Sequence, residues 1–112
     1  MKIDRIDKDK CAILNIHGSL SVENITLFQE ELNFCLTTDK HVLLDLGEVS
    51  FIDSSTLGVI VLFYSKMISE KRHLVIANVK PEIIQMLNLT GISKKMKIFN
   101  SINDAEDFVK KL

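Results

Sequence analysis

Residues 42–58 read VLLDLGEVSFIDSSTLG, and this stretch decides how the chain is expected to fold. Residues 41–46 are nearly continuously apolar, as a central strand covered on both faces would be. A turn and a short apolar segment are expected next, and then a helix that opens at Asp53-Ser54-Ser55. A helix N-terminus carries unpaired N–H groups and a partial positive charge, so it stabilises a phosphate or a partner's acidic group. The stretch therefore suggests a protein switched by serine phosphorylation.

Strands and helices alternate along the rest of the chain, and a polar turn at residues 7–10 joins the first two strands. This order indicates one α/β domain over residues 1–112, with a mixed, mainly parallel sheet of about five strands flanked by about four helices. The expected strands lie near residues 3–6, 12–16, 41–46, 73–77 and 98–99, and the expected helices cover 22–37, 54–71, 81–91 and 102–109.

Five residues mark the ends of these elements. Gly18 is expected to end the second strand, and Ser21 to cap the first helix. Pro81 suits the first turn of a helix, where its missing N–H costs nothing. Gly91 suits a helix end in the left-handed conformation, and Ser101 begins a capping box.

The helix expected at residues 54–71 is apolar on more than one side. At about 100° per residue, Val59, Leu62 and Phe63 fall away from its core face. Either another helix covers them or they form a contact surface for a partner. The expected core face consists of Leu57, Ile60, Val61, Tyr64, Met67 and Ile68.

Composition excludes several classes of protein. The formal net charge of −1 argues against direct nucleic-acid binding, and no apolar run approaches the length of a membrane span. The N-terminus has no apolar segment typical of a secretion signal, so a cytoplasmic protein is expected. Cys11 and Cys35 lack metal-site spacing and are expected to be buried free thiols.

The charge is unevenly distributed along the chain. Residues 1–70 hold 6 basic and 11 acidic side chains, a balance of −5, whereas residues 71–112 hold 8 and 4, a balance of +4. Lys94, Lys95 and Lys97 make the second part locally dense in positive charge. They fit a solvated loop or a phosphate-binding patch, and the charge asymmetry could also orient a protein partner.

The serines at the start of the second helix have two interpretations. Asp53 or Ser54 could simply cap the helix, or the hydroxyl could accept a phosphate. Catalysis is not expected, because the Gly-x-Ser-x-Gly turn of serine hydrolases is absent. The carboxylate cluster of a phospho-aspartate receiver and a Gly-rich phosphate loop are absent too. No cofactor or metal is therefore expected.

The chain resembles the STAS domain family, and within it the bacterial anti-sigma factor antagonists. The resemblance extends over almost the whole chain, and its specificity lies in the order and spacing of several short motifs. These motifs are Gly18-Ser19-Leu20, Leu43-Leu44-Asp45-Leu46, Phe51-Ile52-Asp53-Ser54-Ser55, Leu57-Gly58, and residues 78–82, 87–91 and 99–101.

The resemblance implies a partner switch. The unphosphorylated protein would bind an anti-sigma factor that is itself a serine kinase of the GHKL type, and would thereby free a sigma factor. The kinase would phosphorylate Ser54, with Ser55 and Thr56 as alternative acceptors, and a serine phosphatase would reset the switch. The partner-binding residues implied are Ser21, Asp53, Ser54, Ser55, Thr56, Gly58 and Leu62.

Two positions depart from the family pattern. Ser21 stands where the family often has Asp, and Thr56 stands where it usually has Gly, so contacts near the phosphorylation site are expected to differ. The rival hypothesis is a structural STAS module that is not phosphorylated, such as a small subunit of a lipid-transport ATPase or a stressosome scaffold subunit.

Overall fold

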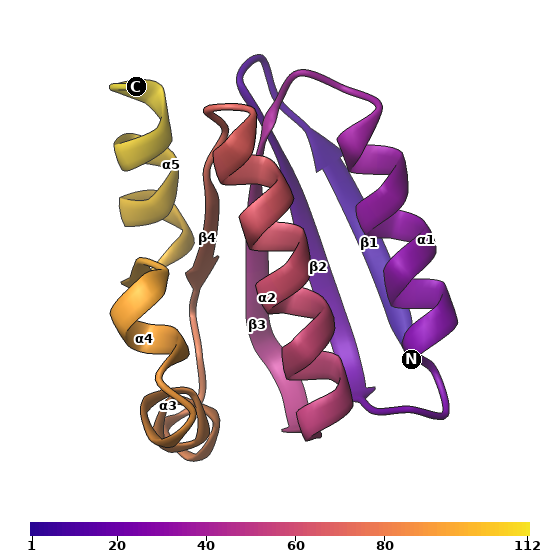
Figure 1. Ribbon diagram of the computed structural model, residues 1–112. Coiled ribbons are helices and arrows are strands. Elements are labelled where there is room, and N and C mark those ends of the chain that lie inside the picture. The colour runs from indigo at the N-terminus through magenta and orange to yellow at the C-terminus, as the bar shows by residue number, and fades with distance from the viewer.

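The computed structural model describes all residues from 1 to 112. Its strands are β1 (Lys2–Asp7), β2 (Cys11–Leu20), β3 (His41–Ile52), β4 (Leu74–Ala77) and β5 (Ile98–Phe99). Its helices are α1 (Ile25–Leu36), α2 (Ser54–Ser69), α3 (Pro81–Leu89), α4 (Ile92–Lys95) and α5 (Ile102–Lys110). The strands form one sheet in the order β1-β2-β3-β4-β5 (Figure 1). Only β1 and β2 are antiparallel, which confirms the mixed, mainly parallel α/β class.

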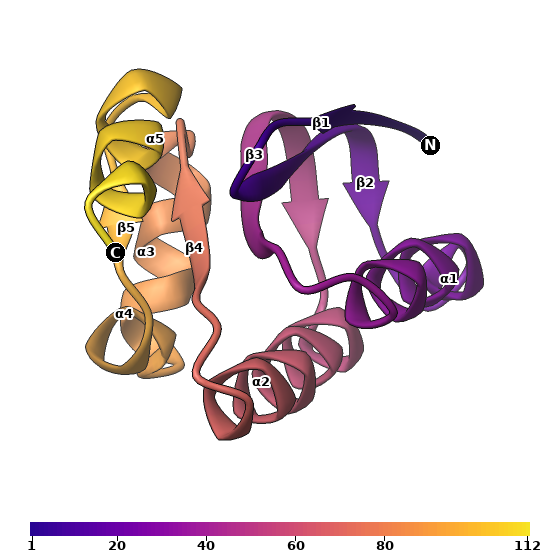
Figure 2. The same ribbon diagram turned by 90° about the horizontal axis from the view of Figure 1, so that it is seen from above.

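The helices cover the two faces of the sheet unequally. Helices α1 to α4 pack on one face, where they form the larger core, and Figure 2 shows α1 and α2 lying against this face. On the other face, α5 is the one helix that contributes to the core, through Ala105 and Val109. The strand residues buried beneath α5 are Cys11, Ile13, Leu43, Val75 and Ala77.

Strands β2 and β3 are longer than expected. Gly18 does not end β2 but lies within it, at a φ of 103° that favours glycine. The turn expected after residue 46 is wrong as well, since β3 continues to Ile52. The two strands run parallel as far as the pair Leu20 and Ile52, with register shifts on the way. Their mutual hydrogen bonds keep the backbone extended where local sequence alone favours a turn.

Helix α1 begins three residues later than expected, and Ser21 does not cap it. Asn24 is the N-cap residue, but its side chain makes no capping bond. Instead, Asn24 Oδ1 accepts a 3.0 Å hydrogen bond from the Ser21 N–H, and Asn24 Nδ2 donates to the Ser19 carbonyl at 2.7 Å. Residues 21–24 therefore form a turn of their own between β2 and α1.

The core face of α2 is rotated from the expected one. Phe63, expected to lie away from the core, is buried, and Ile68, expected within it, is exposed. Phe63 packs in the larger core together with Phe28 and Leu32 of α1, so a neighbouring helix covers this side. Leu62 remains 67% exposed.

The expectations at the other helix ends are confirmed. Pro81 occupies the first turn of α3, and Gly91 follows that helix with a φ of 81°. The Ser101 hydroxyl accepts a 3.1 Å hydrogen bond from the Asp104 N–H and caps α5. Cys11 and Cys35 are buried free thiols. The short helix α4, at the lysine-rich segment, was not anticipated.

Candidate functional site: the start of helix α2

The carboxylate of Asp53 organises the N-terminus of α2. Its Oδ1 atom accepts hydrogen bonds of 2.9 Å from both the backbone N–H and the hydroxyl of Thr56. Its Oδ2 atom accepts a 2.8 Å bond from the N–H of Val22 in the β2–α1 turn. These bonds, the Thr56 N–H above all, hold the pKa of Asp53 below its usual value. Asp53 therefore remains ionised at neutral pH, and its carboxylate connects the β2–α1 turn with the first turn of α2.

The sheet brings the β2–α1 turn and the start of α2 together. Strands β2 and β3 are parallel, so their carboxyl ends lie at the same edge of the sheet. The Asp53 N–H donates to the Leu20 carbonyl at 3.0 Å, directly beyond the last pair of the ladder. Ser21 and Asp53 thus lie close together although 32 positions separate them.

The two serines are exposed and neither caps the helix, because Asp53 supplies the cap. Thr56 differs from them: its side chain is buried, with 0% exposed, and its hydroxyl is bonded to Asp53. Of the three expected acceptors, Ser54 and Ser55 can be reached from solvent and Thr56 cannot.

An exposed strip runs along α2 from the serines. Ser54, Gly58 and Leu62 follow one another at intervals of four residues, so they share one face of the helix. Gly58 and Leu62 are both exposed, and Leu62 borders a groove of about 210 Å³ between α1 and α2. The expected partner-binding residues on α2 therefore form a continuous surface, apart from the buried Thr56.

Two residues of this region were missed in the sequence. Val22 is 65% exposed, and its backbone N–H donates to Asp53. Phe51 is 49% exposed and lies at the end of β3, two residues before Asp53. Phe51 lies two residues before Asp53 and is visible in the sequence as an apolar neighbour, whereas Val22 falls within the range expected for the first helix. Both lie near the end of the sheet at which α2 begins, so they add exposed apolar surface to that end of the domain.

The histidines do not approach the serines. His41 begins β3 and so lies at the opposite end of that strand from Asp53, and His73 directly precedes β4 at the same far end. His17 lies on β2, with Nε2 3.6 Å from Asp4 Oδ2. No histidine is therefore placed to act as a general base on Ser54. The structure contains no group of three or more His, Cys, Asp or Glu side chains that could bind a metal ion.

Comparison with known proteins identifies the class. The STAS domain family matches residues 2–105, and the chain belongs to this family. A Thermotoga maritima protein, provisionally named an anti-sigma factor antagonist, is 28% identical over 105 residues, or 92% of this chain and 93% of that protein. An anti-sigma F factor antagonist of Paenibacillus polymyxa is 36% identical over 66 residues, which cover 57% of this chain and 56% of that protein.

Solved structures agree with this assignment. A crystal structure from Thermotoga maritima, also provisionally described as an anti-sigma factor antagonist, has a TM-score of 0.86 and 26% identity. The match covers 96% of this chain and 94% of that one. The Bacillus cell fate determinant SpoIIAA in its phosphorylated form has a TM-score of 0.74 at 14% identity, with 96% and 99% of the chains covered, and it shows the fold alone. No helix of the present structure has the length and apolar character needed to cross a membrane.

Proposed function

We propose that this protein is an anti-sigma factor antagonist of the cytoplasm that acts by binding and is switched off by phosphorylation at Ser54. In its unphosphorylated form it binds an anti-sigma factor that is a serine kinase, and a serine phosphatase restores this form. The names of the relatives support the partner class. The observation that carries the choice of this site is the exposed Ser54 hydroxyl beside the ionised carboxylate of Asp53.

Geometry excludes one of the three candidate acceptors, and the family resemblance decides between the other two. Thr56 is buried and its hydroxyl is bonded to Asp53, so a kinase would have to unwind the helix start to reach it. Ser55 is exposed like Ser54, and the family resemblance, which places the acceptor directly after the aspartate, decides between the two.

The phosphate would change the charge of the contact surface. A phosphoserine adds about −1.5 to −2 charges at neutral pH. The N-terminus of α2 could neutralise part of this charge, but Asp53 already occupies the Thr56 N–H. The new charge would therefore add to that of Asp53, on a part of the domain that also exposes the apolar side chains of Val22 and Leu62. A partner that covers these side chains would have to desolvate a dianion, so the complex would dissociate.

The experiment compares three variants in binding to the cognate kinase. We expect Ser54→Ala to bind as tightly as the unmodified protein and to accept no phosphate, and Ser54→Asp to bind at least tenfold more weakly. Ser55→Ala is the matched control and should still accept one phosphate. Phosphate found by mass spectrometry on Ser55 or Thr56, or equal affinity of the alanine and aspartate variants, would contradict the proposal.

A further inference from the structure

The charge asymmetry of the sequence is also an asymmetry in space. Figure 1 shows that α3, α4 and α5 lie along one side of the molecule, and that α1 and β1 lie along the other. Residues 80–112, which supply that first side, hold 6 basic and 4 acidic side chains, a balance of +2, whereas residues 1–70 carry −5. One side of the domain is therefore basic, and the phosphorylation switch does not account for it.

A cleft of about 690 Å³ lies on this basic side, and it contains lysines without acidic neighbours. Lys94, Lys95 and Lys97 line it, and no aspartate or glutamate does. None of the three takes part in an ion pair, although several basic residues elsewhere do. By contrast, the cavity of about 290 Å³ beneath α5 has Asp9 and Glu106 among its lysines. The larger cleft thus offers uncompensated positive charge.

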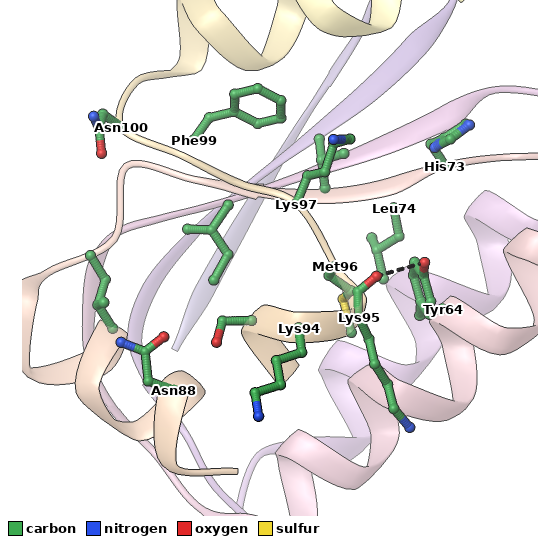
Figure 3. Close-up of a pocket in the computed structure, with 14 residues that line it drawn as sticks. Tyr64, His73, Leu74, Asn88, Lys94, Lys95, Met96, Lys97, Phe99 and Asn100 are labelled. Carbon is green, nitrogen blue, oxygen red and sulfur yellow. Dashed lines mark hydrogen bonds between the residues drawn. The ribbon is translucent and has the colours of Figure 1, made fainter. Parts of the chain in front are cut away.

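The wall of the cleft is held in place, and its charges are spread out. The Tyr64 hydroxyl of α2 donates a 2.8 Å hydrogen bond to the Lys95 carbonyl, which ties the C-terminal end of α4 to α2. Figure 3 shows Lys94 and Lys97 extending to different sides of the cleft. Lys97 lies over the ring of Phe108, 5.3 Å from its centre. Charges that do not converge suit an extended anion better than a single compact phosphate.

The outermost strand on this side of the sheet, β5, borders the same cleft. Strand β5 is the last strand of the sheet and pairs only with β4, through Ile76 with Ile98 and Ala77 with Phe99. Ile98 and Phe99 line the cleft and are half-buried, so they offer apolar contacts between the lysines. An unpaired strand edge can accept an additional extended segment through main-chain hydrogen bonds.

We propose that this cleft binds an extended acidic segment of a partner protein, in which apolar residues alternate with carboxylates. The carboxylates would meet the three lysines, and the apolar side chains would meet Ile98 and Phe99. The surface is separate from the switch, since Tyr64 lies ten residues after Ser54 on α2, or roughly 15 Å along the helix axis. The proposal does not depend on phosphorylation of Ser54.

The test uses the full chain and a fluorescein-labelled peptide in which glutamate alternates with valine. Fluorescence anisotropy should show binding that weakens with added salt, and a peptide with lysine in place of glutamate should not bind. The triple variant K94E/K95E/K97E should bind the acidic peptide about tenfold more weakly, as expected for three exposed ion pairs. The triple variant K2E/K66E/K111E changes net charge equally at exposed lysines outside the cleft, and it should bind as the unmodified protein does.

Amide NMR signals locate the bound peptide. Shifts at residues 97–100, unchanged in size when Ser54 is replaced by Asp, would support the proposal. Any of three results would overturn it: no binding at millimolar peptide, equal loss of affinity in the two triple variants, or shifts confined to residues 51–58. A single-stranded oligonucleotide of equal charge that displaces the peptide at lower concentration would assign the cleft to nucleic acid instead.

Discussion

The Val22 N–H lies 2.8 Å from Asp53 Oδ2, and this bond ties the turn after β2 to the start of α2. The same carboxylate receives both the N–H and the hydroxyl of Thr56. One side chain therefore sets the position of the exposed Val22 relative to Ser54. The turn after β2 and the first turn of α2 are therefore held together by a single acceptor group.

Replacing Thr56 by valine should weaken this connection. Thr56→Val keeps the shape of the buried side chain but removes the hydroxyl that Asp53 accepts, so the free energy of unfolding should fall by about 1 kcal/mol. The pKa of Asp53 should rise toward its usual value, because one of the hydrogen bonds that lower it is lost. Urea unfolding and an NMR titration of Asp53 measure the two effects. Thr56→Ser retains the hydroxyl and should leave that pKa low, and an equal rise in both variants would contradict this account.

Arg72 should be among the most sensitive polar residues. It is buried, and its guanidinium donates to the Cys35 carbonyl at 2.8 Å and to the Lys40 carbonyl at 2.7 and 2.9 Å, near the end of α1. Arg72→Met removes both guanidinium donors from the Lys40 carbonyl and one donor from the Cys35 carbonyl, which keeps the N–H and hydroxyl of Thr38, so the free energy of unfolding should fall by about 2–3 kcal/mol.

The matched control removes only the ion pair of Arg72. Glu70 lies 2.8 Å from the guanidinium, but its side chain is largely exposed, so Glu70→Gln should cost no more than about 0.5 kcal/mol. Equal losses in the two variants would show that the ion pair, and not the carbonyl contacts, carries the effect.

Acid should destabilise the fold through His41. Burial lowers its pKa below the usual 6.5, and the neighbouring His73, Arg72 and Lys10 lower it further. His41 Nδ1 also accepts a 2.9 Å hydrogen bond from the His73 N–H, which requires the neutral ring. The unfolded chain therefore binds a proton more readily than the folded one, and stability falls as pH drops below about 6.5.

Urea unfolding between pH 8 and pH 5 checks the prediction for His41. His41→Asn, which does not titrate, should flatten the pH dependence below pH 6.5. His17→Asn is the matched control, because it removes a histidine of β2 outside this cluster, and the loss of stability in acid should persist in it. A slope that persists in His41→Asn would place the acid sensitivity elsewhere.

Local signals in the sequence were sufficient for the positions of most elements. The apolar runs at residues 41–46 and 73–77 became neighbouring parallel strands, and Pro81, Gly91 and Ser101 occupy the expected helix ends. These signals act within a few residues, through backbone geometry or a single hydrogen bond, so they can be recognised without the fold.

The errors arose where distant residues decide the local structure. Glycine is common in turns, so Gly47 by itself predicts one. In the structure Gly47 lies in β3, where its missing side chain leaves room for the amide of Asn78. That amide donates to Asp45 Oδ1 at 3.3 Å, a contact across 33 positions. The role of Val22 was equally hidden, because it uses a backbone N–H that every residue except proline possesses.

The second face of the sheet is covered by a single helix, α5, which is the last element of the domain to be synthesised. Residues 102–110 leave the ribosome after every strand that α5 covers. Until α5 packs, Ile13, Leu43 and Val75 form an apolar surface that no helix covers. As long as α5 is not packed, this face of the sheet is open, and association with other chains competes with completion of the fold.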